Sequence, residues 1–175
     1  MKPVRLPALV LVALLATLRT GTASGSDPPT VDEVRIQKGA HRLDLLASDG
    51  SVLARYRVAI GPGGPGPKRM EGDRVTPVGT YRVIGRIKGL YHQFLTLDYP
   101  NDTDRRRYAA LKKAGLVPPG VGVGYGIGIH RTGHADWNGV HKESDWTLGC
   151  IALDDDEIDE VARGVKDGTR VVITD

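Results

Sequence analysis

The sequence predicts a single, mainly β domain of the α+β class with two short helices. Its length of 175 residues suits one hydrophobic core, and a hydrophobic fraction of 40% is too high for a disordered chain. The 23 glycines and 11 prolines favour many turns and short strands over long helices. Periodic apolar patterns then place the individual elements.

The strand pattern is clearest over residues 41–60, which we expect to form a hairpin with its turn at 48–51. From Val52 onward every second residue is apolar up to Ile60, which is typical of a half-buried antiparallel strand. Further strands are predicted over 80–87, 94–99 and 170–174. Residues 61–77 are predicted to be a stiff surface loop, because its prolines remove amide donors and no Lys-Ser/Thr pair follows that would form a phosphate-binding loop.

Two helices are predicted. The first covers 101–114, where Asn101, Asp102 or Thr103 can cap the start and Gly115 ends the helix. The second begins at Asp154, where four consecutive acidic residues suit the positive end of a helix dipole. Its apolar residues recur at helical spacing, so we interpret it as a packing helix: Ile158, Val161, Ala162 and Val165.

The N-terminus has the layout of a secretory signal peptide. Two basic residues precede an apolar run over 6–18, and a short segment of small residues follows, with cleavage expected near Ala23. The run is about 13 residues, short of the ~20 that a membrane-spanning helix needs. We therefore expect a signal peptide over 1–25, a linker over 26–33 and a catalytic domain over 34–175. The mature chain is expected in the periplasm or cell envelope, without a stable membrane span after cleavage.

Charge argues against a nucleic-acid partner. The formal net charge is +3, but Lys2, Arg5 and Arg19 all lie in the predicted signal peptide. Without them the basic and acidic residues balance, so the predicted mature domain has no basic excess to attract phosphates.

Candidate catalytic residues concentrate in residues 126–153, which hold three of the five histidines and the only cysteine. A single cysteine excludes an internal disulfide, so Cys150 is inert and buried, half of an intermolecular bridge, or a nucleophile. A working thiol needs an imidazole nearby to favour the thiolate, and His130 ends a predicted strand where substrate can reach it. Backbone amides of residues 148–150 can face a developing oxyanion. Burial of the cysteine and a structural role for the histidine are the simpler alternatives.

A metal site is a further alternative. His130 and His134 are four residues apart, with Asp136 and His141 close by, and imidazoles suit zinc. Gly133 weakens the helix that would align the first two, and no HExxH motif is present. The pattern therefore favours thiol chemistry over zinc.

These residues resemble the catalytic domain of L,D-transpeptidases of the YkuD type, whose signature is a His followed at some distance by Ser/Thr-x-Gly-Cys. Here the signature is His130 and Thr147-Leu148-Gly149-Cys150. The segment DWTLGCIAL (145–153) is similar to a subgroup of exported peptidoglycan enzymes. Two more stretches resemble family motifs in the same order: GDRVTPVGTY (72–81) and YPNDTDRRR (99–107).

The resemblance implies an L,D-transpeptidase-like β-sandwich with two short helices and neither metal nor cofactor. It implies Cys150 as nucleophile, His130 as its base, and the Gly149 and Cys150 amides as oxyanion donors. His141 is the competing base, or it contacts substrate. The residues expected to bind substrate are His141, Thr147, Leu148, Trp146 and Arg131.

Three positions depart from the usual family pattern. Arg131 replaces the glycine that usually follows the histidine, which leaves the third member of the triad open. Leu148 stands where many relatives have histidine, and Ala152 where they have arginine.

The function implied is cysteine-dependent acyl transfer on peptidoglycan stem peptides, forming cross-links or anchoring protein to the wall, with covalent acylation by carbapenems as an accompanying property. The alternative within the family is hydrolysis, as an L,D-carboxypeptidase or by releasing a wall-attached lipoprotein. A zinc-dependent wall amidase and a non-catalytic wall-binding module are the alternatives from other classes.

Overall fold

The computed structural model describes residues 30–87 and 93–175, so the predicted signal peptide lies outside the described residues. Within them, eight strands follow the order β3-β2-β1-β8-β4-β5-β6-β7. The strands are β1 (Glu33–Gln37), β2 (Arg42–Leu46), β3 (Val52–Arg57), β4 (Gly79–Ile87), β5 (Phe94–Leu97), β6 (Gly128–Arg131), β7 (Ile151–Leu153) and β8 (Arg170–Thr174). Two α-helices accompany them, α1 (Asp102–Lys113) and α2 (Asp155–Gly164), which confirms the predicted mainly β fold.

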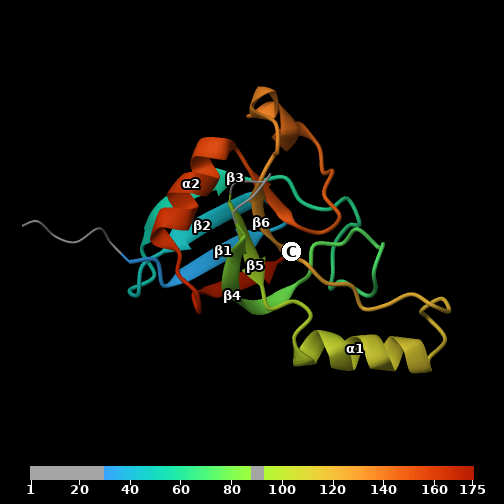
Figure 1. The fold of residues 1–175 in the computed structure, drawn as a ribbon. Helices are drawn as coiled ribbons and strands as arrows, with labels where there is room; N and C mark the ends of the chain where they lie inside the picture. The colour runs from blue at the N-terminus through green and yellow to red at the C-terminus, as the bar shows by residue number, and fades with distance from the viewer. Residues whose placement is uncertain (1–29, 88–92) are drawn as a thin grey trace, which may run out of the picture.

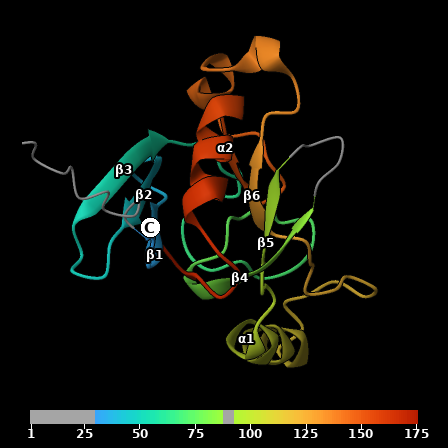
Figure 2. The same ribbon diagram turned by 60° about the vertical axis from the view of Figure 1, so that its left-hand side comes forward.

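The sheet curves until its two ends meet. Strand β1 pairs in parallel with β8, β8 pairs antiparallel with β4, and β6 pairs in parallel with β7. Beyond the end of β3, Ala59 and Ala152 exchange backbone hydrogen bonds of 3.1 and 2.8 Å. Figure 2 shows β1–β3 and β5–β6 on opposite sides of α2. The strand order therefore forms a near-barrel, and β7 is held from both sides.

Helix α2 fills the space between these two groups of strands. Asp154 and Glu157 form a capping box at its start, as the acidic run predicts. Its apolar side, Ile158, Val161 and Ala162, is buried in the core. Burial of Ile158 and of Val161 contributes roughly 1.5–3 kcal/mol each, so α2 is anchored to the core directly after β7.

Helix α1 lies at the opposite end of the molecule from α2 (Figure 1). Asn101 is its cap, accepting hydrogen bonds from the amides of Thr103 at 2.9 Å and Asp104 at 3.2 Å. Only Asp104 of this helix is buried. The polar remainder agrees with a peripheral position away from the core.

The N-terminal hairpin forms as predicted, with residues 47–51 closing the turn between β2 and β3. The fold begins earlier than expected, because β1 starts at Glu33 and Val31 is buried. The end of the predicted 26–33 linker is thus packed. None of the helices in the described part of the chain is long and apolar enough to cross a membrane.

Residues 61–77 form a loop, as predicted, and its two ends are hydrogen-bonded to each other. The Gly61 amide donates to the Thr76 hydroxyl at 3.0 Å, and the Gly63 amide donates to the Arg74 carbonyl at 3.1 Å. Further along, the Gly66 amide donates to the carboxylate of Asp175 at 2.8 Å. The first two bonds close the loop on itself, and the third joins it to the C-terminal residue.

Candidate active site

The turn over residues 147–150 sets the position of the cysteine. Thr147 is buried, and its hydroxyl donates to the Cys150 carbonyl at 2.7 Å and accepts from the Gly149 amide at 3.2 Å. Gly149 has a φ of +125°, and a Cβ there would lie 2.7 Å from the carbonyl oxygen of Val75. Only glycine fits this position without displacing the loop.

Cys150 directly precedes β7 and is partly exposed. Its Sγ donates a weak hydrogen bond to the Gly126 carbonyl at 3.5 Å. Burial raises the pKa of the thiol, while the Gly128 amide and the charge of Lys68 act in the opposite direction. The thiol is therefore neutral at neutral pH and needs a base to ionise.

His130 lies on β6, whose register places it opposite Ala152 of β7, two residues beyond Cys150. Its Nδ1 donates to the carbonyl of Arg131 at 2.6 Å. In a neutral imidazole this bond assigns the proton to Nδ1 and the lone pair to Nε2. Burial lowers the pKa of His130, the Arg131 carbonyl opposes that effect, and His141 lowers it slightly further. His130 is thus a neutral ring with the tautomer that a base requires.

Two aromatic side chains fix the plane of this imidazole. The ring of Phe94 stacks on it with centroids 5.7 Å apart and an angle of 3°, and Phe94 faces His130 across the β5–β6 pair. Trp146 meets it edge-on at 5.9 Å and 79°. Sequence reasoning missed Phe94, although it is the only phenylalanine of the chain.

The thiol and the imidazole line one cavity of about 380 Å³. Its lining residues are Phe94, His130, Trp146, Thr147, Leu148 and Cys150. Leu148 is 74% exposed and covers the outer rim. The structure therefore brings together the predicted nucleophile, the predicted base and three of the predicted substrate contacts.

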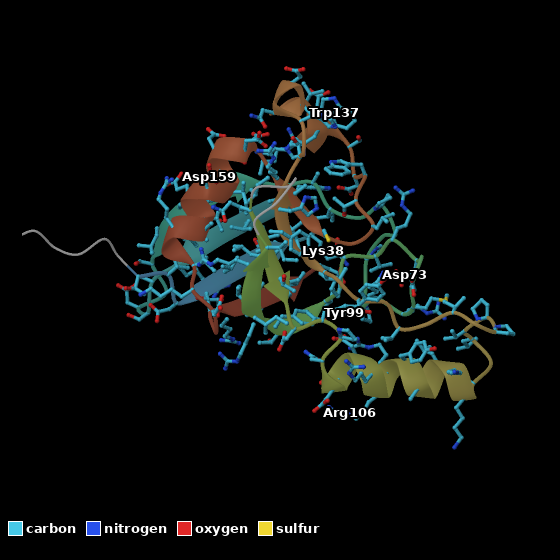
Figure 3. All side chains as sticks on the ribbon, in the orientation of Figure 1. Lys38, Asp73, Tyr99, Arg106, Trp137 and Asp159 are labelled. Atoms are coloured by element: carbon cyan, nitrogen blue, oxygen red, sulfur yellow. The ribbon has the colours of Figure 1, made fainter. Side chains whose placement is uncertain are left out.

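Two predicted substrate contacts lie elsewhere. The guanidinium of Arg131 is 3.5 Å from the Asp155 carboxylate at the start of α2, and only its carbonyl reaches the site. His141 lines a second cavity of about 340 Å³ behind Trp146, together with Trp137, Val140 and Ser144. Figure 3 shows Trp137 at the far tip of this segment.

His141 is held by a hydrogen bond to a carboxylate. Its Nε2 is 2.9 Å from Asp154 Oδ1, while Lys142 Nζ is 2.7 Å from Oδ2 of the same carboxylate and also contacts Glu157. Burial lowers the pKa of His141 although Asp154 opposes that effect. Within residues 30–87 and 93–175 no three His, Cys, Asp or Glu side chains converge in a way that could hold a metal ion.

Sequence reasoning also missed a hydrogen-bond network next to the 147–150 turn. Asp145 accepts hydrogen bonds from the His41 ring at 3.1 Å and from the Ile60 amide at 3.1 Å, and the Ile60 carbonyl accepts from the Thr147 amide at 3.2 Å. His41 and Asp145 are more than a hundred residues apart in sequence. Spacing alone therefore gives no signal for this contact.

Fold and site define a β-rich domain that carries one cysteine and one histidine on a shared apolar cavity. The sequence matches the family model of the YkuD type, the L,D-transpeptidase catalytic domain, over residues 32–173. The chain therefore belongs to the YkuD family of L,D-transpeptidase catalytic domains. No curated protein matches it.

Solved structures share the fold. The helical cell shape determining protein Pgp2 of Campylobacter jejuni aligns over 83% of this chain and 48% of its own, at 25% identity and a TM-score of 0.58. An L,D-transpeptidase of Xylanimonas cellulosilytica aligns over 85% of this chain and 62% of its own, at 14% identity and a TM-score of 0.54. An L,D-transpeptidase of Mycobacterium smegmatis aligns over 82% of this chain and 58% of its own, at 14% identity and a TM-score of 0.51. The chain thus spans about half the length of Pgp2.

Proposed function

We propose that this chain catalyses cysteine-dependent acyl transfer on peptidoglycan stem peptides. The observation that carries the proposal is the shared cavity, on which Cys150 lies with a His130 ring whose tautomer is set by the Arg131 carbonyl. Family membership supplies the substrate class. The third member of the triad is then a backbone carbonyl, which explains why Arg131 can replace the usual glycine.

The first half of the reaction forms a thioester. His130 Nε2 takes the thiol proton, and Cys150 Sγ attacks the carbonyl carbon of the scissile amide in the stem peptide. The carbonyl oxygen becomes an oxyanion that accepts hydrogen bonds from the amides of Gly149 and Cys150. In the resting structure the Gly149 amide donates to Thr147 at 3.2 Å, so substrate would compete with this long bond. His130 returns the proton to the leaving amine as the carbon–nitrogen bond breaks.

The second half resolves the thioester. An acceptor amine attacks, loses a proton to His130 and forms a new amide, while the sulfur leaves as a thiolate that regains the proton. Water in place of the amine gives a carboxylic acid, which is the carboxypeptidase or lipoprotein-releasing outcome. Both outcomes use the same residues, so the product distinguishes them.

The test is mass spectrometry of disaccharide-tetrapeptide fragments incubated with wild type, Cys150→Ala and Cys150→Ser. We expect either dimeric fragments or fragments shortened by the terminal residue with wild type only. Dimers indicate transpeptidation and shortened monomers indicate hydrolysis. Unchanged fragments, together with a Cys150 that iodoacetamide does not label selectively, would overturn the proposal and leave a wall-binding module. Activity lost to a chelator but kept in Cys150→Ser would indicate a zinc amidase.

We also propose that the chain is exported and acts in the periplasm or cell envelope. The layout of residues 1–25 and the substrate class of the family support this. Intact-mass measurement of the protein purified from a cell-envelope fraction should show loss of a segment ending near Ala23. Full-length protein confined to the cytoplasmic fraction would contradict it.

A further inference from the structure

The 61–77 loop contains a buried ion pair that the reaction above does not use. Lys68 Nζ lies 2.5 Å from Asp73 Oδ1, and the two side chains are only 4% and 10% exposed. The same carboxylate accepts the amides of Arg69 at 2.7 Å and Val75 at 3.0 Å. Burial alone would raise the pKa of Asp73, but Lys68 and these amides hold it below its ordinary range. The Asp73 carboxylate is therefore ionised, and Lys68 forms a salt bridge with it.

The loop that holds this pair is packed on the nucleophile turn. The Val75 amide is bonded to Asp73, and the Val75 carbonyl is the group that a Cβ on Gly149 would meet at 2.7 Å. Arg74 donates to the Trp146 carbonyl at 3.2 Å. The ion pair is therefore linked through Val75 to Gly149, the residue that precedes the cysteine.

The lysine also lies beside the segment that accepts the hydrogen bond from the cysteine. Lys68 Cε lies 3.6 Å from the position that a Cβ on Gly124 would take, and the Gly126 carbonyl, two residues on, accepts the hydrogen bond from Cys150. Among the causes that act on the pKa of Cys150, Lys68 is the only charged side chain, and it lowers that pKa. A buried ammonium is poorly screened, so its field acts over several ångströms.

We propose that Lys68 is a positioning residue whose buried positive charge stabilises the Cys150 thiolate, and that Asp73 both orients it and tempers its field. This role of Lys68 rests on the proposed function, because it concerns the thiolate that Cys150 forms in that reaction. Of the other titratable and charged groups, His130 on β6 lines the cavity with Cys150, and Arg74 on the same loop donates to the Trp146 carbonyl. His130 moves the proton, whereas Lys68 keeps its own and lowers the energy of the ionised sulfur.

The chain offers a matched control. Lys38 is buried to the same extent, with a side chain 4% exposed, and pairs with Asp175 at 2.6 Å. It donates to the Gly66 carbonyl at 3.0 Å and so holds another part of the same loop. Figure 3 labels Lys38 at the sheet and Asp73 out on the loop. Removing Lys38 removes a buried charge and a loop contact, but not the charge that acts on Cys150.

The experiment measures the pH dependence of Cys150 alkylation by iodoacetamide in the full chain, for wild type, Lys68→Met, Asp73→Asn and Lys38→Met. We expect Lys68→Met to raise the midpoint by about one pH unit, which slows alkylation tenfold below the midpoint. Asp73→Asn should lower the midpoint, because it removes the opposing negative charge. Lys38→Met should leave it in place. Lys68→Arg, which keeps the charge, should restore most of the wild-type midpoint.

An ion pair with a purely structural role does not shift the alkylation midpoint in opposite directions when Lys68 and Asp73 are replaced in turn. If Lys68→Met and Asp73→Asn shift the midpoint in the same direction, or if Lys38→Met shifts it as much as Lys68→Met, the proposal is overturned. Should Lys68→Met not fold, the sign of the Asp73→Asn shift still decides. Expected shifts without any turnover of wall fragments would refute the proposed function alone, whereas turnover without the shifts would refute only the role of Lys68.

Discussion

His130 and His141 both contact Trp146 and differ in the group that binds the imidazole. Both rings meet Trp146 nearly edge-on, at 5.9 Å and 79° for His130 and at 6.2 Å and 82° for His141. Both are buried, and burial lowers the pKa of each. The partner is a neutral carbonyl for His130 and the carboxylate of Asp154 for His141.

That difference supports His130, rather than His141, as the proposed base. The carbonyl binds Nδ1 of His130 and assigns the lone pair to Nε2 on a ring that lines the cavity with Cys150. Asp154 instead occupies Nε2 of His141, whose Nδ1 is buried without a hydrogen-bond partner among the described residues. The His141 side chain has no exposed surface. We therefore interpret His141 as a link between its loop and the start of α2, rather than as the competing base.

The largest expected effect comes from exchanging the two histidines for alanine in turn. His130→Ala should slow acylation of Cys150 by a carbapenem by roughly 10²–10⁴-fold, since a positioned general base contributes that much. His141→Ala should slow it less than about tenfold, through loosening of Trp146. Stopped-flow or mass-spectrometric acylation rates measure both. A greater loss in His141→Ala would reverse the assignment of the base.

The next effect concerns stability on the His141 side. Asp154→Ala should lower the free energy of unfolding by about 3 kcal/mol, because it leaves His141 without the acceptor of its Nε2 and Lys142 with Glu157 alone. Urea denaturation at pH 7 measures it, with Asp155→Ala at the neighbouring position as control.

The same carboxylate gives a pH test. Burial would raise the pKa of Asp154, but Lys142, the Gly139 amide and His141 hold it below the ordinary value. Its contribution is therefore present above about pH 4 and is lost as the pH falls through the lowered pKa. Wild type and Asp154→Ala should thus converge in stability at low pH. A difference that stays constant down to pH 2 would contradict a role for the ionised carboxylate.

The sequence predicted some elements of the fold and the site better than others. Local patterns predicted the hairpin, both helices and the last strand, because caps, turns and apolar spacing act over a few residues. Strand β7 was not predicted, because its three residues are all buried and show no alternation of apolar and polar side chains. The family motif led to His130 and Cys150, but the partner of His130 is a backbone carbonyl, which no side chain in the sequence reveals.

Contacts between distant segments account for the rest of the site. The stacking of Phe94 on His130 depends on the register of β5 against β6, and the Lys68–Asp73 pair matters only because its loop folds onto residue 149. Arg131 and His141 were predicted as substrate contacts from their position beside the motif. The structure directs both toward α2, and sequence proximity could not distinguish a side chain that faces the cavity from one that faces away.

A smaller effect is expected in the pH profile of acylation. Because burial lowers the pKa of His130, the ring stays neutral and able to accept a proton below its ordinary pKa of about 6.5. The acylation rate should therefore hold from neutral pH down past that value and then fall as the ring protonates. Rates measured between pH 4.5 and 8 test this, with alkylation of free cysteine as the reagent control. An acid limb centred above pH 7 would show that the imidazole is charged at rest.

The smallest effect is expected at Arg131, the position where this chain departs from the family glycine. Its side chain pairs with Asp155 at 3.5 Å, and only its carbonyl contacts His130. Because substitution keeps the carbonyl, Arg131→Ala should change the acylation rate less than about threefold and the unfolding free energy by no more than about 1 kcal/mol. The His130→Ala variant is the positive control in the same assay. A hundredfold loss of acylation rate in Arg131→Ala with unchanged stability would mean that the guanidinium itself reaches substrate. The proposal that Arg131 acts only through its carbonyl, which orients His130, would then be wrong.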